Sequence, residues 1–277
     1  MKIVVTGANG YIGSHVVTEL LNNNHNVIAV DIKHDNIDKR AIIDDIDIFN
    51  TKENLYKRWR EPDVIIHFAC KDVAIHNSFW HIESIPYNFK FLKTLIDNGL
   101  KQVITIGSMH DIGYYEGAVN ENTNPNPLTF YGISKDTLRR LIKIYTDNKP
   151  VVYKHLRFFY TYGDDEKSSG SIFSKILQME KEGKKSFPFT DGKNKFDYIE
   201  IHDLAKQIRC VIEQNEITGI INCCSGKPIA IKDMVEKFIK DHKLKIKPDY
   251  GKFPTRAYDS PCVYGDNAKI NKIMKNL

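Results

Sequence analysis

Long apolar runs are missing from this chain of 277 residues. No stretch of about eighteen apolar residues occurs, so we expect no membrane-spanning helix. The opening MKIVVTGANG contains only a brief apolar run before glycine interrupts it, which is too short for a secretory signal peptide. We therefore expect a cytoplasmic protein that has no membrane partner.

The cysteines are few and follow no recognisable pattern. Their number is odd, two are adjacent, and no C-x-x-C spacing occurs, which argues against a disulfide framework and against a zinc site. We expect free thiols in a reducing compartment and no bound metal. The five are Cys70, Cys210, Cys223, Cys224 and Cys262.

A concentrated basic surface is also lacking. The formal net charge of +5 is modest, and the one dense lysine segment, DHKLKIKPDYGK, is short. Nucleic-acid binding usually needs a clustered basic patch with aromatic residues within it, so we expect no nucleic-acid partner. A mild positive charge can still attract a phosphorylated ligand.

The N-terminus carries a strand, a glycine-rich turn and a helix in succession. KIVVTG is a short β-branched run, typical of a strand that is buried on both faces, and it leads into Gly7, Gly10 and Gly13. The apolar residues between positions 16 and 21 share one helix face. Glycine lets the backbone approach a pyrophosphate, and the helix N-terminus supplies N–H groups to it. The segment predicts a dinucleotide-binding unit.

Asp31 ends the next apolar segment, NVIAVD, about twenty residues beyond the glycines. A carboxylate in this place accepts hydrogen bonds from the adenosine ribose hydroxyls and repels the extra phosphate of NADP. NAD is therefore the favoured cofactor, while Lys33 and His34 nearby leave NADP possible.

Strand and helix patterns continue to alternate after Asp31. Residues 62–70 and 101–108 are predicted as buried strands, and the segment between them has helical spacing with a C-cap signal at Asn98-Gly99. The alternation predicts an α/β fold with a Rossmann-type, doubly wound parallel sheet. Ligands bind beyond the carboxyl ends of such strands, and Ser108 lies at one of these ends.

Tyr131 and Lys135 stand four residues apart in FYGISKD, so on a helix they share one face. A positive charge beside a phenol favours the phenolate and lowers the pKa of the tyrosine. Such a tyrosine can exchange a proton with an alcohol oxygen near neutral pH, and Ser108 can hydrogen-bond the same oxygen. The pattern indicates proton transfer by Tyr131, with hydride transfer by a nicotinamide cofactor.

The chain resembles the extended short-chain dehydrogenase/reductases, specifically the NAD-dependent nucleotide-sugar epimerases, dehydratases and reductases, in its motifs TGANGYIG, DDIDIFN, HFAC, YGISK and KFDYIEIHDLA. The resemblance implies that Ser108, Tyr131 and Lys135 are catalytic. It also implies a set of cofactor contacts: Gly7, Gly10, Tyr11, Ile12, Gly13, Asp31, Asp45, Ile46, His67, Phe68, Ala69, Cys70, Tyr131 and Lys135.

The alternation becomes less regular after about Gly163, which predicts two parts. Residues 1–162 form the cofactor domain, and residues 163–277 form a smaller substrate-binding lobe that is interleaved with the sheet. A capped helix followed by an extended segment is expected near residues 168–189. The resemblance also implies a homodimer, packed through the helices near YNFKFLKTLID and KDTLRRLIKIYT.

The expected substrate is a nucleotide-diphosphate sugar. A guanidinium suits a diphosphate, although a surface salt bridge explains Arg256 equally well. His110 is either a wall of the sugar pocket or a loop residue, and Asn88 either lies near the active site or bridges a helix to a loop. The predicted substrate contacts are Asn88, Met109, His110, Tyr160, Ser171 and Arg256, with Phe173 and residues 193–195 as further walls.

Two departures from the family pattern bear on the reaction. Ile112 stands where a tyrosine is usual, and Tyr160 replaces the common asparagine after Arg157. Met109 and His110 replace the Asp-Glu pair that marks dehydratases. The resemblance is therefore to the 4-keto-6-deoxy-sugar reductases, which reduce a C4 ketone with NAD(P)H. The alternatives are a 4-epimerase that retains its NAD and a non-catalytic nucleotide-sensing protein.

Overall fold

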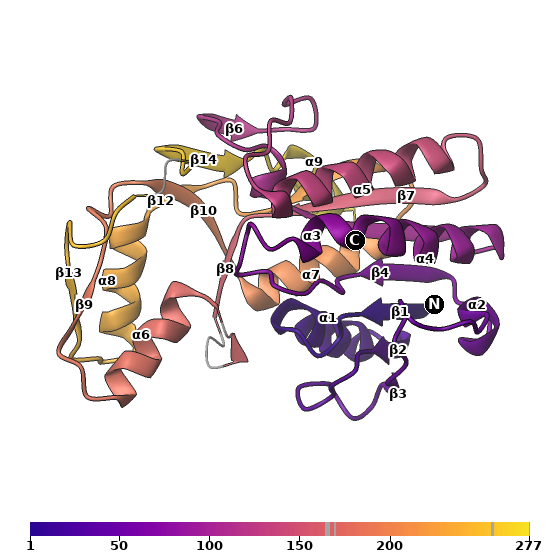
Figure 1. The fold of residues 1–277 in the computed structure, drawn as a ribbon, viewed down its shortest axis with the longest axis horizontal. Helices are drawn as coiled ribbons and strands as arrows, with labels where there is room; N and C mark the ends of the chain where they lie inside the picture. Colours follow the sequence, from indigo (N-terminus) through magenta and orange to yellow (C-terminus); the bar gives the residue numbers. More distant parts are fainter. Residues whose placement is uncertain (164–166, 169, 256–257, 277) are drawn as a thin grey trace.

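The computed structural model describes residues 1–163, 167–168, 170–255 and 258–276. Its larger part is a parallel sheet of seven strands in the order β11-β7-β5-β4-β1-β2-β3 (Figure 1). The predicted α/β fold with a doubly wound parallel sheet is confirmed. The strands are β1 (Lys2–Thr6), β2 (Asn26–Val30), β3 (Ile42–Asp44), β4 (Val64–His67), β5 (Gln102–Ser108), β7 (Val152–Phe158) and β11 (Gly219–Cys223).

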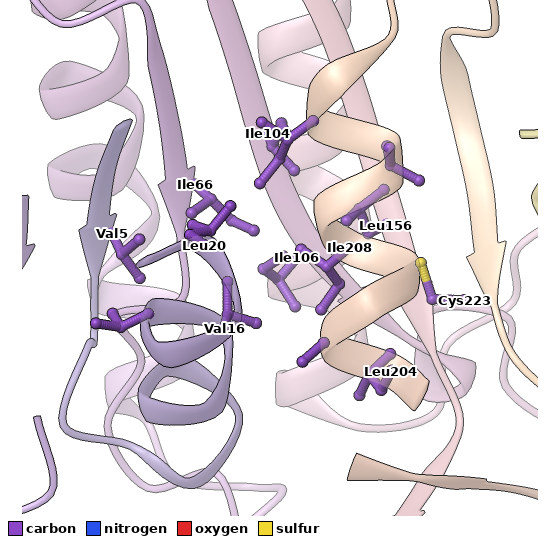
Figure 2. Close-up of a cluster of buried hydrophobic side chains, with 14 of the residues drawn as sticks. Val5, Val16, Leu20, Ile66, Ile104, Ile106, Leu156, Leu204, Ile208 and Cys223 are labelled. Carbon is purple, nitrogen blue, oxygen red and sulfur yellow. The ribbon is translucent and has the colours of Figure 1, made fainter. Parts of the chain in front are cut away.

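Helices cover both faces of this sheet, which explains why its central strands are apolar on both sides. One face packs against α1 (Tyr11–Asn22), α7 (Ile201–Glu213) and α9 (Ala268–Lys275). Figure 2 shows this layer, in which Val16 and Leu20 of α1 and Ile208 of α7 meet the side chains of the strands.

The other face carries α2 (Leu55–Arg58), α4 (Ile85–Asp97) and α5 (Phe130–Thr146), with the short α3 (Trp80–Glu83) packed on α4 and α5. The predicted C-cap of α4 is confirmed, because Asn98 caps the helix and Gly99 has a φ of 108°. α4 and α5 lie side by side, and a dimer through them stays a prediction. No helix among the described residues is both long and apolar enough to cross a bilayer.

The strand order places a topological switch point between β1 and β4. The chain runs outward from β1 through β2 and β3, and then returns to β4 on the other side of β1. Ligands of such sheets bind in the crevice at the carboxyl ends of the strands next to the switch point. Thr6, His67 and Ser108 end β1, β4 and β5 at this edge.

The smaller part is a mixed sheet in the order β12-β10-β14-β6, with β8 paired to β10 as well. β12 runs antiparallel to β10, whereas β8 and β14 run parallel to it. The sheet contains β6 (Gly117–Val119), β8 (Tyr160–Tyr162), β10 (Lys195–Glu200), β12 (Pro228–Ala230) and β14 (Cys262–Gly265).

Two helices and a strand pair complete this lobe: α6 (Ile172–Lys181), α8 (Ile231–Asp241), and β9 (Ser186–Pro188) with β13 (Lys247–Asp249). The predicted capped helix and extended segment are confirmed, because Ser171 Oγ accepts a hydrogen bond from the Ser174 N–H (2.9 Å) at the start of α6. Phe173 and Phe238 pack with ring centroids 4.8 Å apart in the lobe's core.

Each of the two parts contains segments from the other half of the chain. β6 comes from the front half of the chain but pairs in the small sheet, while β11, α7 and α9 come from the back half and complete the large sheet with its cover. A single 3₁₀ turn, η1 (Met109–Asp111), follows β5 on the crossing from the large sheet to β6. The boundary at residue 162 stays a prediction.

Candidate active site

The glycine turn after β1 is packed so closely that it has room only for hydrogen atoms. A Cβ on Gly7 would lie 2.7 Å from the backbone N of Ala69, and one on Gly13 would lie 2.3 Å from the carbonyl oxygen of Gly7. No side chain caps the first N–H groups of α1. Backbone amides at a bare helix N-terminus suit a pyrophosphate, so this turn fits the predicted dinucleotide.

Asp31 lies directly after β2 and reaches back to the glycine turn. Its Oδ2 accepts a hydrogen bond from the Asn9 N–H (3.1 Å), and its Oδ1 accepts one from the Lys33 N–H (3.2 Å). The carboxylate is thereby held at the edge where an adenosine ribose would lie. Asp45 and Ile46 follow β3 at the same edge.

Tyr11 and Ile12 open α1 and have different surroundings. The Tyr11 hydroxyl donates a hydrogen bond to the carbonyl oxygen of Gly163, so it ties the glycine turn to the segment after β8. Ile12 packs against the hydrophobic core below the turn. The structure thus places both at the cradle, and their contact with the cofactor stays a prediction.

His67 ends β4, and both nitrogens of its ring form hydrogen bonds. Its Nδ1 hydrogen-bonds with Thr6 Oγ1 (2.7 Å) and its Nε2 with Asn88 Oδ1 (2.6 Å). Burial lowers the pKa of His67 to about 4, so the ring is neutral near pH 7. The Asn88 amide also donates to the carbonyl oxygen of Ser84 (2.8 Å). The bonds join α4 to the end of β4, and contact of Asn88 with the substrate stays a prediction.

Ser108, Tyr131 and Lys135 come together at the carboxyl edge of the sheet. Ser108 Oγ accepts a hydrogen bond from the His110 N–H (3.3 Å), and Ser108 lies close enough to Tyr131 to lower the pKa of its phenol. Tyr131 lies in the first turn of α5, whose N-terminus Thr129 caps by accepting from the Gly132 N–H (3.1 Å). The Lys135 ammonium lies over the Tyr131 ring, 5.5 Å from its centroid.

Three histidines surround the Tyr131 ring. His76 stacks on it with centroids 5.6 Å apart, and His81 meets it edge-on at 5.2 Å. His110 lies at 6.2 Å. Only His110 was expected, because His76 lies in the irregular stretch after β4 and His81 in the short helix α3, and no periodicity marks either of them. In the described part of the chain, no His, Cys, Asp and Glu side chains group so as to hold a metal ion.

The surroundings of Tyr131 change the expectation for its ionisation. Burial raises the pKa of Tyr131 above its usual range, the charges of Cys70 and Asp111 raise it further, and the hydrogen bond with Ser108 lowers it. The expected lowering of the Tyr131 pKa is therefore wrong for this set of residues, because burial raises it. Tyr131 is protonated near neutral pH.

Cys70 is the partner of Lys135 in this site. Burial raises the pKa of the Cys70 thiol, but Lys135 and a hydrogen bond with His81 lower it more, so its pKa lies below the ordinary value. In turn, the hydrogen bond with Cys70 raises the pKa of His81. The thiol lines a cavity of about 30 Å³ together with Asn88 and Lys135.

Cys70 is expected to be more reactive than the three buried thiols of the protein. Burial raises the pKa of Cys210, Cys223 and Cys224, and thiolates are the nucleophilic form. We expect iodoacetamide to label Cys70 about tenfold faster than these three, and NAD to slow the labelling. Peptide mass spectrometry over time measures this. Equal rates at Cys70 and Cys210, or labelling unaffected by NAD, would contradict the expectation.

The residues predicted to bind substrate do not share one environment. Met109 is buried in the core of the small lobe, and so is Ile112, one of the two departures from the family pattern. Tyr160 is half-buried, with its ring stacked 5.5 Å from that of Tyr198. Ser171 is the cap of α6 described above.

Other predicted substrate contacts lie apart from the cleft or outside the described residues. Phe173 is only 2% exposed, so it belongs to the core rather than to a wall of the cleft. Lys193 is exposed and pairs with Asp191 (3.5 Å). Arg256 lies outside the described residues. Tyr258, close by in sequence, places its hydroxyl 3.5 Å from His76 Nδ1.

The chain belongs to the NAD-dependent epimerase/dehydratase family, whose model matches residues 3–224. This confirms the resemblance that the motifs indicate. The dTDP-6-deoxy-L-talose 4-dehydrogenase (NAD(+)) of Aggregatibacter actinomycetemcomitans is a relative with 38% identity over 272 residues, which cover 96% of this chain and 99% of the relative.

Solved structures agree on the fold. The UDP-glucuronic acid 4-epimerase of Bacillus cereus, in complex with UDP-glucuronic acid and NAD, superposes with a TM-score of 0.81 at 26% identity, covering 99% of this chain and 93% of that chain. The UDP-N-acetylglucosamine 4-epimerase of Methanobrevibacter ruminantium superposes with a TM-score of 0.86 at 22% identity, covering 98% and 91%.

Proposed function

We propose that this protein interconverts a C4 ketone and a C4 hydroxyl on a nucleotide-linked 6-deoxy sugar with NAD, and that it acts as a 4-ketoreductase. One observation carries the proposal. Ser108, Tyr131 and Lys135 converge beside a dinucleotide cradle in a chain that is 38% identical, over 96% of its length, to a 4-dehydrogenase of such a sugar.

The residues divide the proton chemistry among themselves. When bound, the nicotinamide supplies or accepts the hydride. Ser108 already accepts a hydrogen bond from the His110 N–H, so its own proton is available to the ketone oxygen. Tyr131 gives its proton to that oxygen as the alcohol forms, and the resulting phenolate regains a proton from solvent. Lys135 provides the positive charge that offsets the phenolate.

The 38% identity to a dTDP-6-deoxy-L-talose 4-dehydrogenase supports a net redox reaction at C4 rather than an epimerisation. A 4-epimerase uses the same residues but must also run the oxidation and retain its cofactor. Asp31, held at the glycine turn, supports NAD rather than NADP.

The test is turnover of dTDP-, GDP-, CDP- and UDP-linked 4-keto-6-deoxy sugars with NADH or NADPH. We expect stoichiometric oxidation of NADH, fastest with the dTDP sugar, and the reverse reaction with dTDP-6-deoxy-L-talose and NAD. Interconversion of two hydroxy sugars without net oxidation would indicate the epimerase instead. Binding of nucleotide sugars without any turnover would indicate the sensing protein.

A further inference from the structure

A buried carboxylate lies directly beneath the catalytic serine. Asp111 is fully buried, and its Oδ2 accepts a hydrogen bond from the Ser108 N–H (3.1 Å). Ser108 Oγ in turn accepts from the His110 N–H, so the two side chains close η1 from both ends. The backbone that carries Ser108 is thus fixed by Asp111.

Asp111 is itself held by a histidine of the neighbouring strand. His155 Nε2 lies 3.1 Å from Asp111 Oδ2, and His155 Nδ1 lies 2.9 Å from Thr105 Oγ1. Thr105 Oγ1 is also 2.8 Å from the hydroxyl of Tyr153. Burial lowers the pKa of His155, so the ring is neutral near pH 7 and leaves the charge of Asp111 in place.

Gly107 leaves room for the pair of Asp111 and His155. A Cβ on Gly107 would lie 2.2 Å from both Asp111 Oδ2 and His155 Nε2. Any larger residue just before Ser108 would therefore separate the carboxylate from the imidazole. The contact between Asp111 and His155 therefore depends on a glycine at position 107.

We propose that Asp111, held in place by His155, is a positioning residue that aims the Ser108 hydroxyl at the reacting oxygen. This rests on the proposed function of Ser108 in binding that oxygen. His155 fixes the carboxylate, and the carboxylate fixes the turn that carries Ser108.

Asp111→Ala tests the carboxylate, because alanine removes the oxygen that accepts from the Ser108 N–H. In ketone reduction with NADH, kcat should fall about tenfold. Asp111→Asn retains an oxygen for this N–H and should recover most of the rate. Asp136→Asn, a change at a buried carboxylate paired with Arg139 and Arg140, should leave kcat unchanged. Equal losses in the alanine and asparagine variants of Asp111 would overturn its positioning role.

The His155 variants test the positioning separately, even if Asp111→Ala fails to fold. His155→Asn keeps the nitrogen that faces Thr105 and loses the one that faces Asp111, so kcat should fall about tenfold. His155→Gln restores a donor toward Asp111 and should recover most of the rate. Equal rates for the two variants would overturn the role of His155.

A readout without turnover separates this inference from the proposed function. Amide hydrogen exchange of residues 105–113 should be faster in His155→Asn than in the wild type, and slow again in His155→Gln. If no sugar is turned over, the proposed function fails, but hydrogen exchange still tests whether His155 stabilises the turn that carries Ser108. Unchanged exchange in His155→Asn would overturn the positioning role.

Discussion

Replacing Tyr131 by phenylalanine is expected to lower kcat for ketone reduction about a thousandfold, or about 4 kcal/mol of transition-state stabilisation. The substitution removes one oxygen and leaves the ring between His76 and His81, so folding and NAD binding should be unaffected. Steady-state kinetics with NADH and a dTDP-linked 4-keto-6-deoxy sugar measure kcat. Calorimetric titration measures NAD binding, and thermal unfolding measures the stability of the fold.

Tyr56→Phe is the matched control for this loss. Tyr56 is also a buried tyrosine, and its hydroxyl donates to the carbonyl oxygen of Gly99 (3.2 Å) far from the glycine turn. It should retain nearly the full rate. If the Tyr131 variant works as fast as the Tyr56 variant, Tyr131 is not the proton donor and the assignment of the site is wrong.

Gly7→Ala is expected to reduce NAD affinity by about two orders of magnitude and the Tm by about 10 °C. Gly7 has a φ of 70°, which an L-residue adopts only with strain, and its Cβ would lie 2.7 Å from the Ala69 nitrogen and 2.9 Å from the Phe68 carbonyl carbon. Both contacts are backbone atoms, so the strand ends that form the cradle must move apart. Titration with NAD and a thermal melt measure the two effects.

Gly183→Ala is the control that shows the effect of backbone strain without a steric clash. Gly183 has a φ of 75°, close to that of Gly7, but a Cβ there meets nothing within 4 Å. Its alanine variant should lose about 3 °C in Tm through strain alone and bind NAD normally. Similar losses in both variants would mean that the tight approach to Ala69 has no role in the cradle.

Local patterns were enough to predict the large sheet and the convergence of Ser108, Tyr131 and Lys135 at its edge. The parallel strands are short β-branched runs, and Tyr131 and Lys135 share a face because helical geometry requires it. Each of these features depends on residues that are close in sequence. The same holds for the cap of α6 by Ser171, a spacing signal that the structure confirms.

The missed features depend on contacts between distant segments. His76, in an irregular stretch, and His81, in the short α3, contact Tyr131 across about fifty residues of sequence, and no periodicity predicts these contacts. The pairing of Cys70 with Lys135 and the raised pKa of Tyr131 likewise follow from burial, which only the assembled fold defines. Asp111 did leave a signal, because Ser-x-x-Asp is the spacing of a capping box.

The crossing of segments between the two sheets limits how the protein can be recombined. A fragment that stops at Tyr162 lacks β11, the outermost strand beside β7, and the helices α7 and α9, which cover one face of the sheet together with α1. Its apolar surface would lie open to water, and the strand after the serine turn would lose its neighbour β14. A chimera that is meant to exchange sugar specificity between relatives should therefore exchange the segments of the small lobe together with the residues they pack against. A single junction between two halves of the chain would separate segments that pack together.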